Sequence, residues 1–221
     1  IGVRFVPIID GVVIKEDYMA RFSSGRMNHV HVIMGSTCDE DCLHETQDND
    51  YENYLENAKH YGKYEEEYKR VFPAENNEQA GRVISVERTA RTFAGMRLQA
   101  DFQQKQGMNA YLYSFTQNLP NADGSLLGPF HSSELVYQFG TLYTGWRPWR
   151  EEDYAASERM MNYWANFVKN GDPNGEGLPK WEKHVPGDDQ CMLLCADSKM
   201  GRVPHEEQVE FMTKCILESC H

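Results

Sequence analysis

Short apolar runs alternate with long helical segments along this chain, and this alternation limits the fold more than any other feature. Three runs have the length and side-chain content of buried strands: "HVHVIMGST" at 29–37, "NAYLYSFTQ" at 109–117 and "QCMLLCAD" at 190–197. Helical spacing fills the intervals between them. The sequence therefore predicts an α/β fold with a mostly parallel sheet flanked by helices.

The expected helices have recognisable ends. One pattern runs through 54–72 and stops at Pro73, and a second runs from Glu87 and is closed by Gly107. A third begins with acidic residues after Arg150 and is closed by Gly171, and the last starts at Pro204. The stretch "SSELVYQFG" after His131 has the spacing of one more amphipathic helix.

The overall charge excludes two classes of partner. With 22 Lys and Arg against 34 Asp and Glu, the chain carries a formal net charge of -12. Such a surface repels phosphate backbones and anionic lipid, so we expect no nucleic-acid partner. We also expect no membrane span, because no apolar run approaches the roughly 20 residues that a spanning helix needs.

Six cysteines fall in three close pairs: Cys38 with Cys42, Cys191 with Cys195, and Cys215 with Cys220. Local disulfides or metal ligands are open alternatives, but structural zinc sites use CxxC knuckles, and none of these spacings fits. Near neighbours on one helix or strand often cannot meet disulfide geometry. We therefore expect free thiols, which favours a reducing, cytoplasmic compartment.

Chemistry-bearing side chains follow two of the predicted strands. Asp39, Glu40 and Asp41 come after the first strand, and the loop after the second leads to His131. In α/β sheets, catalytic groups gather at the carboxyl ends of the strands. A carboxylate and an imidazole on neighbouring loops can form the orienting half of a nucleophilic triad. The alternative is a solvated acidic run and an ordinary loop histidine.

Four segments resemble, in order and spacing, the C-terminal half of the type-B carboxylesterases, the cholinesterase-like branch of the α/β-hydrolases. They are "FVPIIDGVVI", "GRMNHVHVIMGSTCDEDC", "GPFHSSELVYQFG" and "MMNYWANFVKNGDPNGEGLPKWEKH". The last is the most specific. The resemblance runs from about Phe5 to at least Trp181 and implies one partial domain over 1–221, the C-terminal part of an α/β-hydrolase fold, incomplete without its N-terminal half.

The resemblance also implies roles for individual residues. The family's triad acid, in a G-x-x-x-D-E word, falls on Glu40, and its triad base falls on His131; Glu134 matches a position that looks structural. The chain departs from the family at Asp41, where Gly is usual, and at His31, where Pro is frequent. Asp39 is a rival for the acid. The chemistry implied is hydrolysis of a small-molecule carboxylic ester, with no metal or organic cofactor.

The nucleophile of such a triad is missing from the sequence. No serine lies in a G-x-S-x-G elbow, and the family's glycine-rich oxyanion loop is absent too. We therefore expect a fragment that is inactive alone and that pairs with the missing N-terminal half or self-associates through an exposed sheet edge. A non-catalytic, cholinesterase-like interaction protein is the alternative. His29 and His31 form an H-x-H pair, which we interpret as two imidazoles near the start of a strand rather than as metal ligands.

Overall fold

The computed structural model describes residues 7–17, 20–21, 24–41, 43 and 50–219. Its main sheet has four strands in the order β1-β2-β5-β6. The first three, β1 (Val32–Thr37), β2 (Ala110–Phe115) and β5 (Gln190–Leu194), are parallel, and β6 (Lys199–Arg202) runs antiparallel to β5. The sheet is mostly parallel, and its three parallel strands are the three runs that the sequence predicts.

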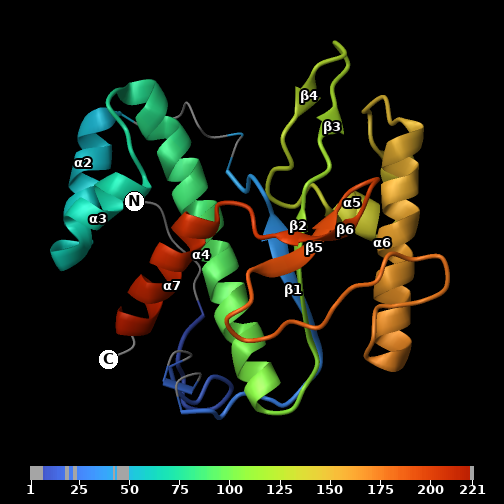
Figure 1. Ribbon diagram of the computed structural model, residues 1–221, viewed down its shortest axis with the longest axis horizontal. Helices are drawn as coiled ribbons and strands as arrows, with labels where there is room; N and C mark the ends of the chain where they lie inside the picture. Colours follow the sequence, from blue (N-terminus) through green and yellow to red (C-terminus); the bar gives the residue numbers. More distant parts are fainter. Residues whose placement is uncertain (1–6, 18–19, 22–23, 42, 44–49, 220–221) are drawn as a thin grey trace.

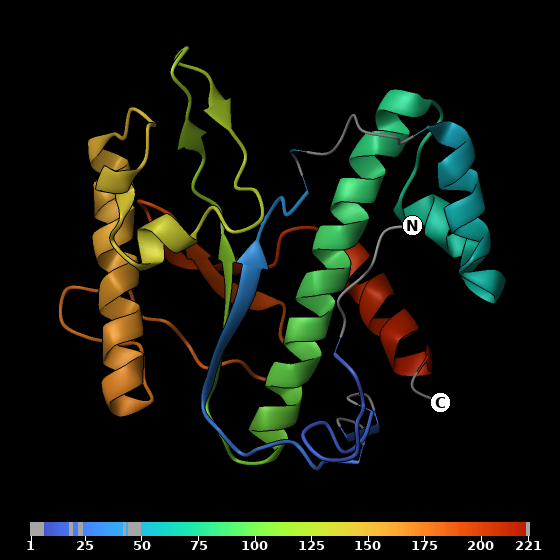
Figure 2. The same ribbon diagram turned by 180° about the vertical axis from the view of Figure 1, so that it is seen from behind.

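Helices cover both faces of this sheet (Figure 1). On one face lie α4 (Asn77–Lys105) and α7 (Glu206–Ser219), with α2 (Tyr51–Lys59), η2 (Gly62–Tyr64) and α3 (Glu65–Val71) outside them. On the other lie α5 (Leu135–Gln138), η3 (Leu142–Thr144) and α6 (Glu151–Asn170). A hairpin of β3 (Leu119–Pro120) and β4 (Leu126–Leu127) projects beyond the strand ends (Figure 2).

Side-chain alternation along β2 divides the core into two clusters. Ala110 and Leu112 point to the cluster under α4 and α7, whereas Tyr111, Tyr113 and Phe115 point to the cluster under α5 and α6. Successive strand residues face opposite sides of a sheet, so a strand buried on both faces is apolar throughout. This explains why the β2 run is largely apolar in the sequence, with the buried Ser114 as the exception.

A close approach between β1 and β2 requires glycine at position 35. A Cβ placed on Gly35 would lie 2.1 Å from the carbonyl oxygen of Tyr113 and 2.6 Å from its ring. Only a residue without a side chain lets the Tyr113 ring pack across β1.

Three helix expectations differ from the structure in their extent. The 54–72 pattern is interrupted around Gly62, whose φ is +55°, and so forms α2, η2 and α3. Helix α4 begins at Asn77, where the Asn76 side chain caps it, and not at Glu87. The helix after His131 is a single turn, α5, because the chain turns at Gly140 with φ of +64°.

Among the cysteines that the structure describes, Cys38, Cys191 and Cys195 are free thiols. Cys191 and Cys195 therefore do not bridge each other, as predicted. Cys42 and Cys220 lie outside the described residues. Among the helices of the described chain, none combines the length and the apolar character needed to cross a bilayer.

Candidate active site

Two loops meet at the carboxyl edge of the sheet. One follows β1 and carries Cys38, Asp39, Glu40 and Asp41; the other leaves β2 and reaches His131 through the β3–β4 hairpin. Because β1 and β2 are adjacent parallel strands, their carboxyl ends lie at the same edge. The N–H of Cys38 donates to the carbonyl of Phe115 at 3.0 Å, which ties the first loop to the end of β2.

Glu40 and His131 contact each other twice. The carboxylate oxygen Oε2 of Glu40 lies 2.6 Å from Nδ1 of the imidazole. The backbone N–H of His131 donates to the backbone carbonyl of Glu40 at 3.0 Å. The main-chain bond holds the two loops in register, and the side-chain bond orients the ring.

The environment of the pair is asymmetric. The Glu40 side chain is only 13% exposed, whereas that of His131 is 80% exposed. The second carboxylate oxygen of Glu40 accepts the N–H of Thr37 at 2.8 Å, so both oxygens are engaged by the protein. Nε2 is the ring nitrogen left for a further partner, since Nδ1 faces Glu40.

The other two acids of the run point elsewhere. Asp39 accepts a hydrogen bond from the Ser85 hydroxyl at 3.1 Å, and Asp41 forms an ion pair with Arg88. The structure thus brings Glu40 to His131, and neither Asp39 nor Asp41 makes that contact. The Asp41 charge, at a position where the resemblance leads one to expect Gly, is matched by a cation.

Glu134 lies behind the pair on the first turn after His131. Its Oε2 is buried and has no hydrogen-bond partner among the described residues. Burial raises the pKa of Glu134, and the nearby Glu40 carboxylate raises it further while His131 opposes this. Tyr113 is close to the same groups: burial, with the charges of Glu134 and Glu40, raises the pKa of its hydroxyl.

Two features fix the backbone around His131: a left-handed conformation at Ser132 and the contacts that Arg147 makes. Ser132 has φ of +68°, a left-handed conformation that is unusual for a residue with a side chain. Arg147 stacks over Phe130, 5.7 Å from guanidinium carbon to ring centroid, and donates to the carbonyl of Pro120 at 2.9 Å. Arg147 therefore links the histidine loop to the hairpin.

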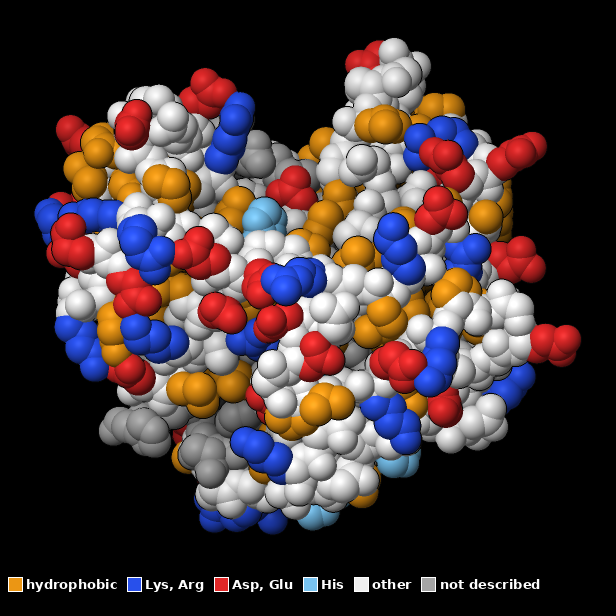
Figure 3. All heavy atoms as spheres, in the orientation of Figure 1, with side chains coloured by type: hydrophobic (Ala, Val, Ile, Leu, Met, Phe, Trp, Pro, Cys, Tyr) orange, Lys and Arg blue, Asp and Glu red, His pale blue; other side chains and the backbone are white. Residues whose placement is uncertain are grey.

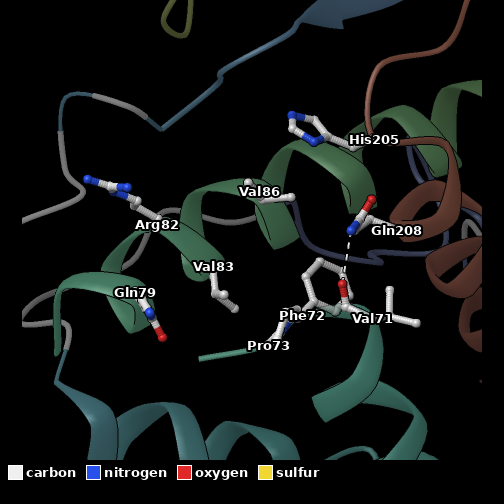
Figure 4. Close-up of a pocket in the computed structure, with 9 residues that line it drawn as sticks. All are labelled: Val71, Phe72, Pro73, Gln79, Arg82, Val83, Val86, His205 and Gln208. Carbon is white, nitrogen blue, oxygen red and sulfur yellow. Dashed lines mark hydrogen bonds between the residues drawn. The ribbon is translucent and has the colours of Figure 1, made fainter. Parts of the chain in front are cut away.

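A notch opens on this edge of the molecule. Figure 3 shows a histidine and hydrophobic side chains at its base, between the α2–α4 lobe and the lobe of the hairpin and α6. A pocket of about 240 Å³ lies between α3, α4 and the start of α7; its lining includes Phe72, Val83, Val86, Arg82 and His205 (Figure 4). His205 connects this pocket to the acid loop, because it faces Asp39 and the carbonyl of Cys38.

Two other possible sets of ligand groups lie away from this site. His31 accepts the N–H of Asn109 through Nδ1 at 2.9 Å. Asp189, Glu206 and Glu210 place carboxylate oxygens within 4.8 Å of one another, but Arg202 pairs with Glu206 there. Sequence reasoning missed Thr37, Ser85, Arg88 and Thr89 around Glu40, and nothing in their spacing along the chain signals such contacts.

Comparisons with known proteins show similarity to one family. The profile of the carboxylesterase family matches residues 1–212. Over 124 residues, 54% of this chain, the sequence is 32% identical to the acylcarnitine hydrolase of Rattus norvegicus, and over 111 residues, 48% of this chain, it is 33% identical to the cocaine esterase of Homo sapiens. Carboxylesterase 5A of Felis catus is 31% identical over 126 residues, 53% of this chain. The matched segments span 20–23% of the length of these relatives.

Proposed function

This chain belongs to the carboxylesterase family, and from that premise we propose that Glu40 and His131 are the acid and base of a Ser-Glu-His triad in an ester hydrolase. The observation that carries the proposal is the 2.6 Å contact between Glu40 Oε2 and His131 Nδ1. A carboxylate at one imidazole nitrogen keeps the proton on that nitrogen, so the other is free to act as a base.

In the proposed reaction, His131 Nε2 accepts the proton of a serine hydroxyl while the serine oxygen attacks the ester carbonyl. The tetrahedral intermediate collapses as the C–O bond to the alcohol breaks, and His131 gives the proton to the departing alcohol. A water molecule then repeats the sequence on the acyl-enzyme and releases the acid. Glu40 stabilises the imidazolium that forms in each half of the cycle.

The serine has to come from another polypeptide segment, since the 221 residues contain no G-x-S-x-G elbow. The same segment has to supply the donors that stabilise the oxyanion. We therefore propose that the chain by itself does not hydrolyse esters and that catalysis requires an N-terminal partner segment.

The outer edge of β1 is the proposed contact for that segment. Within the described residues β1 pairs with β2 alone, so its other edge is open to pairing with a further strand. The hydroxyls of Ser36 and Thr37 are buried without a hydrogen-bond partner in the described chain. A groove of about 370 Å³ runs beside the strand, lined by Val30, Val32 and Met34 together with Gln99 of α4. A second copy of the chain is the alternative occupant of this edge.

The proposed substrate class is a small-molecule carboxylic ester. Two of the relatives are named for the hydrolysis of acylcarnitines and of cocaine. Acylcarnitines and cocaine are both esters of small organic alcohols, and we propose only this shared class as the substrate of the present chain.

Complementation tests the proposal. The chain would be co-expressed with a carboxylesterase N-terminal segment that carries the G-x-S-x-G elbow, and the serine would be probed with a fluorophosphonate and with p-nitrophenyl butyrate. We expect labelling and turnover only when both pieces are present, and loss of both with His131→Ala. Labelling of the complex that is as fast with His131→Ala as with His131 would refute the triad assignment. Sedimentation of each piece alone and of the mixture would separate pairing with the partner from self-association.

A further inference from the structure

One face of α4 contacts Asp39, Glu40 and Asp41, the three consecutive acids that follow β1. Ser85, Arg88 and Thr89 are spaced i, i+3 and i+4, so they lie on the same side of the helix. Each meets a different acid: the Ser85 hydroxyl donates to Asp39, Arg88 pairs with Asp41, and the Thr89 oxygen accepts the N–H of Glu40 at 3.0 Å.

The Arg88–Asp41 ion pair keeps the Asp41 charge from disturbing the contact between Glu40 and His131. Asp41 is adjacent to Glu40 in the chain, and its side chain is only 15% exposed, so its charge is poorly screened by water. Arg88, 61% exposed on α4, provides the counter-charge. A carboxylate held in this way has less freedom to swing toward the imidazole or to repel Glu40.

Asp39 is held from several directions as well. Besides the Ser85 hydroxyl, it faces His205, and its Oδ2 lies only 2.8 Å from the position that a Cβ on Gly128 would take. Burial lowers the pKa of His205, which Asp39 and the Cys38 carbonyl partly oppose. Figure 4 shows His205 beyond the Val86 side of α4, at the rim of the pocket. Asp39 is thus packed between α4, the start of α7 and the histidine loop.

We propose that Ser85 and Arg88 are positioning residues that hold Asp39 and Asp41 on α4, so that Glu40 alone among three consecutive acids pairs with His131. The inference rests on the acid–base pair of the proposed function. It adds the contacts on α4 that leave Glu40 as the acid facing His131. Thr89 adds a third contact from the same helix face, because its hydroxyl oxygen accepts the backbone N–H of Glu40.

The test measures which carboxylate sets the tautomer of His131 in the chain itself, without any catalytic readout. With ¹⁵N-labelled histidine at alkaline pH, imidazole nitrogen shifts give the ratio of the Nδ1–H to the Nε2–H tautomer. The His131 signals are identified among those of eight histidines by their loss in His131→Gln. The measured factor is the fold decrease in this ratio that Glu40→Gln causes. It is measured in the unaltered chain and again in chains that also carry a substitution in α4.

We expect this factor to fall about threefold in Arg88→Gln and in Ser85→Ala, the size expected for loss of a partly exposed polar contact. The matched control is Arg82→Gln, which removes another exposed arginine of α4 whose partner, Glu78, is on the same helix. It should leave the factor unchanged. Arg88→Lys should keep most of it, and adding Asp41→Asn to Arg88→Gln should restore it, because a neutral amide needs no counter-charge.

Two results overturn the inference in different ways. If the factor in Arg88→Gln equals that of the unaltered chain, α4 does not select the acid, and the triad assignment stands. If Glu40→Gln leaves the tautomer ratio unchanged in the unaltered chain, the Glu40–His131 pairing fails, and the proposed function loses its support together with the inference. Should Arg88→Gln fail to fold, Ser85→Ala decides the same question, because a factor equal to that of the unaltered chain in this variant also overturns the inference.

Discussion

Oε2 of Glu40 lies 2.6 Å from Nδ1 of His131, although 91 positions separate the two residues in the sequence. The contact follows from parallel pairing of β1 with β2, which brings the loops after both strands to one edge of the sheet. A main-chain bond of 3.0 Å between the same two residues holds the loops together. The pair is therefore positioned by the backbone as well as by two side chains.

Replacing the acid should separate Glu40 from its rival. In the complemented enzyme, Glu40→Gln should lower kcat by about 10⁴, the size of the loss when a triad acid becomes an amide. Asp39→Asn should lower kcat/KM by less than about tenfold, because Asp39 bonds to Ser85 and not to the imidazole. Steady-state hydrolysis of p-nitrophenyl butyrate measures both. A larger loss from Asp39→Asn than from Glu40→Gln would move the acid by one residue.

Glu134→Gln should stabilise the chain increasingly as the pH rises. The pKa of Glu134 is raised in the folded state, chiefly by burial. The stability that the protonated Glu134 contributes is therefore complete below pH 4.5 and is lost as the pH rises through its raised pKa. The difference in Tm between Glu134→Gln and the unaltered chain should therefore grow between about pH 4 and about pH 8. Exposed Glu158 on α6 offers a control: Glu158→Gln should change Tm equally at both pH values. A Tm gain from Glu134→Gln that becomes smaller as the pH rises would contradict the raised pKa of Glu134.

Two glycine-to-alanine changes should have opposite signs. Gly35→Ala should cost about 3 kcal/mol of unfolding free energy, because the new methyl group meets the backbone of β2. Gly95→Ala, within α4, meets nothing within 4 Å and should gain about 0.5–1 kcal/mol through helix propensity. Urea unfolding of both variants measures the pair. Equal effects would show that β1 does not pack on Tyr113 as described.

Ser132→Gly should relieve the strained backbone beside His131. A side chain at φ of +68° costs about 1–2 kcal/mol, and the greater freedom of glycine in the unfolded chain cancels part of the gain, leaving about 0.5 kcal/mol of stabilisation. Ser132→Ala keeps the Cβ and should bring no such gain. Chemical denaturation of the two variants separates strain from the loss of the hydroxyl; a gain in Ser132→Ala equal to that in Ser132→Gly would rule strain out.

Local signals in the sequence identify most of the regular structure. The apolar runs coincide with β1, β2 and β5, and α6 ends at Gly171 as its capping pattern predicts. Element ends are less well predicted, because turns such as the one at Gly62 interrupt a helical pattern without changing its hydrophobic period. The words "GSTCDE" and "HSSELVYQFG" also single out Glu40 and His131 from the sequence alone, through their resemblance to the family's motifs.

Only the tertiary structure decides which of three consecutive acids meets the imidazole. Apart from the resemblance to the family's motif, nothing local distinguishes Asp39, Glu40 and Asp41, because all three carry a carboxylate. Ser85 and Arg88 lie 46 and 47 residues further along the chain than the acids they contact. They reach the acids because α4 packs across β1. The sequence by itself determines which residue types arrive at the sheet edge, since periodicity and turns are local properties. Which carboxylate faces His131 depends on contacts between distant segments, and these exist only once the helix is packed on the sheet.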